Sequence, residues 1–234
     1  MANDFFAAGN DVSALDSQTR FIQGVYLWMA LALAVTAGSS FLTINTGLLY
    51  LLIAKTGSIG LYVLMAAELG VVIFFSARIR QMSKSAALTA FFAYAILTGI
   101  TLSVVFLAYT SESIVFCFVI AAAMFGGMSL YGLVTRSDLT KVGSYLFMAL
   151  LGVIVASVVN IFLRSGMIRW ITSFATVIIF TGLSAYDAQK LTRVHAAGIG
   201  SDTRVKQSLM GALELYLDFI NIFLALLRIV GRRR

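Results

Sequence analysis

The chain of 234 residues contains no proline, and cysteine and histidine occur only once each. Because proline is the usual cause of a helix kink, any bend must come from glycine, a π-bulge or rigid-body movement. The lone Cys117 excludes an internal disulfide framework. The lone His195 excludes the multi-histidine zinc sites of membrane-embedded hydrolases. Disulfide chemistry and zinc catalysis are therefore poor candidates for its function.

Charged residues are also scarce. They make up 12% of the chain, whereas 60% of the residues are hydrophobic and the mean hydropathy is +0.96. This apolar content exceeds what a water-soluble core could bury, so lipid must be the solvent for most of the chain. The first apolar run is too long for a signal peptide and lacks a clean cleavage site, so we expect it to be retained.

The formal charge of +7 raises the possibility of nucleic-acid binding. The basic residues, however, lie in short clusters at the ends of apolar runs, within residues 78–84, 190–206 and 232–234. This distribution is typical of membrane flanks, and we expect no nucleic-acid partner. The clusters fall on both sides of a seven-span chain in similar numbers, so they leave the orientation open.

Charged or polar breaks divide the chain into seven apolar runs, each long enough to cross a bilayer as a helix. The runs are continuously apolar rather than alternating, which favours helices over a barrel. We predict an all-α integral membrane protein, with one seven-helix membrane domain over residues 1–234, a short polar tail over 1–20 and an interfacial segment over 45–54. The predicted spans cover about residues 21–44, 58–78, 86–109, 114–135, 142–163, 168–191 and 207–230.

Small residues at intervals of four mark the fourth predicted span. Ala122 pairs with Gly126, Ala123 pairs with Gly127, and Gly132 is a further small residue of the same span. This spacing lets helix backbones approach closely in lipid. We therefore predict that these residues form a packing face.

Three carboxylates interrupt the last two predicted spans: Asp187 in the sixth, and Glu214 and Asp218 in the seventh. A charge at the bilayer centre costs about 2.5 to 3.5 kcal/mol or more, so such residues normally face the bundle interior or a wet cavity. Glu214, Asp218 and Asn221 share one stripe of their helix, and Ser184 lies one turn from Asp187. Facing helices would bring Asp187 and Asp218 together.

Two of the acidic residues also have simpler interpretations. Asp187 lies near the end of its span and could sit at the membrane interface. Glu68, in the middle of the second span, is a candidate for the ion pathway. The simpler interpretation is that it does no more than form a hydrogen bond to a neighbouring helix.

The C-terminal third resembles the transmembrane BAX inhibitor motif family through residues 181–189 (TGLSAYDAQ), residues 215–223 (LYLDFINIF) and Leu227-Arg228. The resemblance implies six helices around the seventh and a pH-sensitive calcium leak controlled by an aspartate pair, Asp187 and Asp218. It also implies a basic residue at the end of the second span that bridges to the pair. Arg78 and Arg80 are the candidates, and a plain interface anchor is the alternative for either.

The resemblance suggests a mechanism in which the aspartate pair works as a proton switch. Two carboxyls in one buried site disfavour each other's ionisation, so we expect them to share a proton and hold the helices closed. Deprotonation would drive them apart and expose oxygen ligands that suit calcium, with Glu214 and Asn221 as further ligands along the path. We expect calcium ions, protons and the lipid bilayer as partners, and no cofactor.

Three alternative functions make different demands on these carboxylates. A proton-coupled cation exchanger would need the same carboxylates, whereas an adaptor that binds other membrane proteins, such as proteases or cell-survival regulators, would not need them. Intramembrane aspartyl proteases have Gly-x-Gly-Asp at the second aspartate and a later proline-containing motif, neither of which occurs here, so we expect no enzyme. The short loops indicate a prokaryotic cell membrane as the location.

Overall fold

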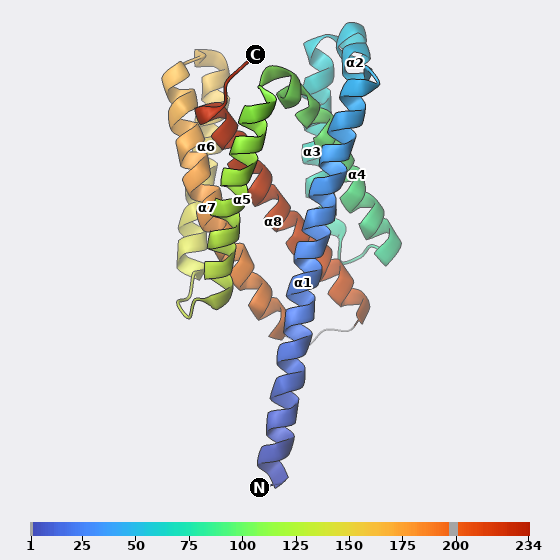
Figure 1. Cartoon of the computed structure of the whole chain (residues 1–234), viewed down its shortest axis with the longest axis vertical. Coiled ribbons are helices and arrows are strands. Elements are labelled where there is room, and N and C mark those ends of the chain that lie inside the picture. The colour runs from blue at the N-terminus through green and yellow to red at the C-terminus, as the bar shows by residue number, and fades with distance from the viewer. Residues whose placement is uncertain (1, 197–200) are drawn as a thin grey trace.

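The computed structural model describes residues 2–196 and 201–234, and the side chains of residues 16–57, 59–193 and 203–234. The described residues are helical almost throughout and contain no strand beyond one isolated bridge, which confirms the all-α prediction. Figure 1 shows the helices packed as a bundle, with the two chain termini at opposite ends. The helices are α1 (Ala2–Asn45), α2 (Leu48–Thr56), α3 (Ser58–Arg78), α4 (Lys84–Ala108), α5 (Ser111–Val134), α6 (Thr140–Leu163), α7 (Gly166–Ala196) and α8 (Ser201–Val230).

Side-chain caps and glycines with positive φ mark several boundaries of these helices, which contain no proline. Ser83 and Thr110 accept backbone hydrogen bonds at the starts of α4 and α5. Gly47 and Gly57, both with positive φ, flank the short helix α2, which overlaps the predicted interfacial segment over 45–54. From Ala2 onward the predicted polar tail is helical, because α1 runs through it without a break and extends beyond the bundle (Figure 1); Met1 lies outside the described residues.

Six of the described helices, α1 and α3 to α7, are long and apolar enough to cross a membrane. The clearest case is α6, whose most apolar window has a mean hydropathy of 2.6 although none of it is buried inside the protein. Only lipid can cover such a surface favourably. The seventh span, over α8, stays a prediction, since this helix is less apolar than the six.

The C-terminal helix α8 is central, as predicted. It crosses the bundle obliquely (Figure 1) and packs mainly against α1, α4, α5 and α7, while α3 and α6 lie outside them on α4 and α7. Its side chains are buried on most faces, including Leu213, Tyr216 and Ile222. Tyr216 shares a 2.8 Å hydrogen bond with Thr36 on α1, and its ring lies 5.9 Å from that of Tyr94 on α4. Asp218 on α8 is therefore surrounded by protein rather than lipid.

Candidate functional site

Asp187 and Asp218 lie side by side where α7 and α8 pack together. Asp187 is 6% exposed and Asp218 is 3% exposed. Their carboxyl groups are close enough for each to act on the charge of the other, and Ser184 lies near the carboxyl of Asp218. The polar stripes predicted on the two helices therefore meet, and the side chain of Asp187 is buried among protein groups.

One oxygen of this pair lacks a partner. Within the part of the chain that the structure describes, Oδ2 of Asp218 is buried and accepts no hydrogen bond. The Ser184 hydroxyl donates its one hydrogen to the Phe180 carbonyl of its own helix, at 2.7 Å. A buried acceptor without a donor costs about 1 to 3 kcal/mol, and more when charged. The site therefore has unused capacity for a proton or a cation.

Lys190 is the cation that accompanies the pair. Its Nζ lies 2.7 Å from Oε1 of Glu214, which joins α7 to α8 by an ion pair of partly exposed side chains. Both groups are close enough to Asp187 to act on its charge. The sequence contained a signal for this residue, because Lys190 lies three residues after Asp187 and so shares its helix face.

The structure does not bring Arg78 or Arg80 to the pair. Arg78 donates to Gln81 at 3.3 Å, and both guanidiniums are exposed. Among the described residues, neither arginine forms an ion pair with Asp187 or Asp218, so the predicted bridge is wrong for this conformation. The physical reason is that α3 packs on α4, so that its end faces α7 and α8 only across a cavity.

The other two predicted pathway residues lie apart from the pair. Glu68, on α3, is half-buried and accepts a hydrogen bond from Thr101 on α4, which is the simpler of its two interpretations. Asn221 lies one turn beyond Asp218, and its amide donates to the Leu217 carbonyl of its own helix at 2.8 Å. The geometry thus groups Glu214 with the pair and leaves Glu68 in a separate polar contact.

Two glycines place α7 closely against its neighbours beside Asp187. A Cβ atom at Gly132 on α5 would lie 2.0 Å from the carbonyl oxygen of Ala185, and one at Gly143 on α6 would lie 2.6 Å from the Tyr186 ring. The packing face predicted on α5 is confirmed at Gly132. It is wrong at Ala122, Ala123, Gly126 and Gly127, because all four residues are exposed and nothing lies within 4 Å of a Cβ at Gly126 or Gly127.

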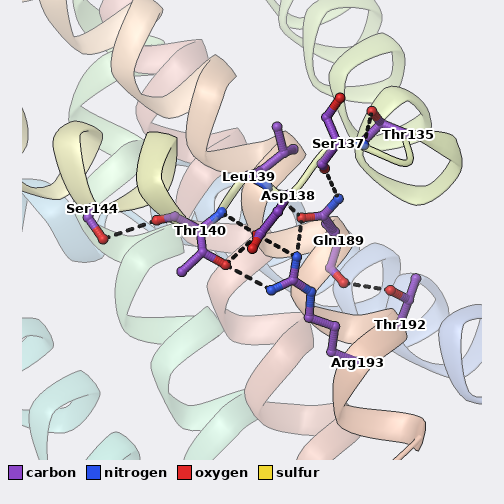
Figure 2. Close-up of polar contacts among 9 residues, drawn as sticks. All are labelled: Thr135, Ser137, Asp138, Leu139, Thr140, Ser144, Gln189, Thr192 and Arg193. Carbon is purple, nitrogen blue, oxygen red and sulfur yellow. Dashed lines mark hydrogen bonds and ion pairs between the residues drawn. The ribbon is translucent and has the colours of Figure 1, made fainter.

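Gln189 fastens the α5–α6 connection to α7, two residues after Asp187 (Figure 2). Its side-chain oxygen accepts from the backbone amide of Leu139 at 2.9 Å, and its amide donates to the carbonyl of Ser137 at 2.7 Å. Both bonds are partly or fully buried, so they hold the connection at a defined height on α7. Sequence reasoning identified Gln189 only as part of a motif and missed this role.

Arg193 extends the same network outward. Its Nη2 lies 2.6 Å from Oδ1 of Asp138, and its Nη1 donates to Thr140 at 2.8 Å (Figure 2). Hydrogen bonds from Thr140 and from Arg193 hold the pKa of the Asp138 carboxyl well below its usual value. The network lies at the end of the bundle, and it fixes α7, and hence Asp187, relative to α5 and α6.

No group of three or more histidine, cysteine, aspartate or glutamate side chains gathers into a metal-binding arrangement within the described residues. The prediction that Asp187 and Asp218 coordinate calcium therefore depends on the two carboxyls alone. Two carboxylates supply fewer oxygens than the six to eight that calcium prefers, so water or backbone would have to complete the shell.

Comparison with known proteins places this geometry in a family. The family described as inhibitor of apoptosis-promoting Bax1 matches residues 18–234. The inner membrane protein YbhL of Escherichia coli (strain K12) is 44% identical over 219 residues, which cover 92% of each chain. A protein of Borreliella burgdorferi is 40% identical over 219 residues, covering 93% of this chain and 94% of that one. With its six candidate spans, the chain is a multi-pass protein of the cell membrane.

Proposed function

The chain belongs to the Bax inhibitor family, and from this membership we propose that it is a calcium-permeable leak of the cell membrane, gated by protonation of Asp187 and Asp218. The observation that carries the proposal is that these two carboxyls are buried close to each other on helices that pack together. A membrane protein has little reason to keep two acids together in its interior unless their charge is used.

This proximity supports a closed state in which the pair holds a proton. Two ionised carboxylates have no hydrogen to share, so a hydrogen bond between them requires that one be protonated. Such a bond would fasten α8, the central helix, to α7. It would also keep the oxygens of both groups from an approaching cation.

Loss of that proton would open the path. Two negative charges so close together repel each other, and burial strengthens the repulsion. Separation would turn the carboxylate oxygens toward the ion path, where Glu214 supplies a third carboxylate once it parts from Lys190. Acid is therefore expected to close the leak and neutral or alkaline pH to open it.

We propose that transport is the activity, with no catalysis and no cofactor. Calcium is the transported ion rather than a resident metal, because the aspartate pair alone offers an incomplete shell. The absence of the Gly-x-Gly-Asp context at Asp218 supports the same view against a protease.

The test is calcium entry into liposomes that contain the purified protein, measured between about pH 5 and 8, where a carboxyl in such a site would titrate. Wild type should show flux that rises with pH, and Asp187→Asn and Asp218→Asn should lose that dependence. Asp16→Asn, which removes an exposed acid at the far end of α1, should behave as wild type.

Each alternative function has its own outcome in this assay. Calcium entry that requires a stoichiometric outward proton flux would identify an exchanger. Folded protein that gives no flux above empty liposomes at any pH would refute transport and favour the adaptor.

A further inference from the structure

A cavity of about 570 Å³ opens between the end of α3, the last turns of α7 and the first turns of α8. Three cations line it, Arg80, Lys190 and Lys206, together with one acid, Glu214. Three positive charges and one negative charge leave an excess of two positive charges. A cavity of this composition attracts anions.

The cations of the cavity differ in whether they already have a hydrogen-bond or ion-pair partner. Lys190 is paired with Glu214, and Nζ of Lys206 donates to the backbone carbonyls of Arg80 at 2.9 Å and Met82 at 3.3 Å. The guanidinium of Arg80 makes no hydrogen bond or ion pair within the described residues. Its planar fork of donors matches the geometry of a phosphate group, which it would bind with two parallel bonds.

The remaining wall of the cavity combines the polar side chains of Ser76, Thr203 and Gln207 with an apolar part. Ile79, Leu191 and Met210 line it beside the charged groups. A soluble anion would gain nothing from these side chains, whereas the glycerol and upper acyl carbons of a lipid would be buried against them. The cavity is therefore amphipathic in the same sense as a phospholipid.

Its position also fits a lipid. The cavity lies at the ends of membrane-spanning helices, and exposed basic residues continue the positive charge around it, namely Arg78, Lys84 and Arg204. This is the level at which lipid headgroups meet a membrane protein. We propose that the cavity binds the phosphate of an anionic phospholipid, with Arg80 as the principal donor and Lys190 and Lys206 as supporting charges.

The test is lipid binding by the full chain in detergent, titrated with phosphatidylglycerol and followed by native mass spectrometry. Phosphatidylcholine of the same acyl composition and inorganic phosphate are titrated in parallel. The protein should bind phosphatidylglycerol more tightly than either. Arg80→Ala should weaken that binding about fivefold, the contribution of one basic residue at an anionic headgroup.

Arg78→Ala is the matched control, because Arg78 is an exposed arginine two residues away that does not line the cavity. It should bind phosphatidylglycerol within about twofold of wild type, since only general surface attraction is lost. Thermal unfolding of both variants confirms that they are folded. Arg80→Gln repeats the test with an uncharged side chain that fills more of the space of arginine than alanine does.

Three outcomes would overturn the proposal. Equal losses in Arg78→Ala and Arg80→Ala would show a diffuse surface attraction instead of a built site. Equal binding of phosphatidylcholine would show that the charge is not used. Inorganic phosphate that competes as well as the lipid would mean that the cavity serves a soluble anion. None of these outcomes depends on calcium flux, so they leave the proposed leak untouched.

Discussion

Replacing Gly132 by alanine is the sharpest test of the packing beside the aspartate pair. The new Cβ would lie 2.0 Å from the carbonyl oxygen of Ala185, and 2.8 and 2.9 Å from that residue's carbonyl carbon and Cα. All three atoms belong to the backbone of α7, so no side-chain rotation can relieve the contact. The helices α5 and α7 would have to separate, and Asp187 lies two residues from the point of contact.

The magnitude follows from two opposing effects. Overpacking of a close contact costs typically about 1 to 3 kcal/mol, and a backbone contact belongs at the upper end of that range. Alanine also favours a helix over glycine by about 1 kcal/mol. Gly132→Ala should therefore lower the free energy of unfolding by about 2 kcal/mol. Gly126 lies on the same helix, and nothing lies within 4 Å of a Cβ at this position. Gly126→Ala should therefore raise the free energy of unfolding by up to about 1 kcal/mol.

Thermal unfolding of the two variants in detergent, followed by circular dichroism, measures the difference. About 3 kcal/mol between them corresponds to a gap of roughly 6 to 12 °C for a chain of this size. Equal melting temperatures would refute the close α5–α7 contact. A lower melting temperature for Gly126→Ala alone would restore the packing face that the sequence pattern predicted.

Two further predictions concern the network around the α5–α6 connection. Gln189→Ala should lower the free energy of unfolding by about 1 to 3 kcal/mol, because it leaves the buried amide of Leu139 without an acceptor. Ser144→Ala is the control, because it removes only an exposed hydrogen bond, and it should change the stability by no more than about 0.5 kcal/mol. Equal melting temperatures of the two variants would contradict this prediction. Hydrogen bonds, chiefly from Thr140, keep the pKa of Asp138 low, so its carboxylate stabilises the fold above the ordinary carboxyl pKa of about 4 and this contribution fades in acid. The deficit of Asp138→Asn in melting temperature should therefore be present at pH 7 and shrink as the pH falls below about 4, while a deficit that is constant with pH would refute the assignment.

The helices themselves were predictable from composition and hydropathy. The predicted boundaries of the second span, residues 58–78, match α3, and those of the next three spans differ from α4 to α6 by three residues or fewer. The start of α1 at Ala2 was not predictable from hydropathy, because hydropathy does not tell a helical polar segment from an irregular one.

The rotation of most helices about their axes was not predictable. In a membrane, both the lipid-facing and the protein-facing sides of a helix are apolar, so hydrophobic periodicity does not tell them apart. The pattern of small residues on α5 therefore indicated Gly126, Gly127 and Gly132 alike, whereas of these three only Gly132 makes a close contact. On α8 the polar stripe removed this ambiguity, because charged groups must avoid lipid.

The sequence by itself determined that this is a helical membrane protein, and that Asp187 and Asp218 must be sheltered in its interior, since the cost of a charge in lipid leaves few alternatives. Only the tertiary structure decided what surrounds them. It places Lys190 rather than Arg78 or Arg80 beside the pair, because the partner of a charge depends on which helices are neighbours. Neighbours in a bundle are set by close packing between distant segments, and no local pattern records that.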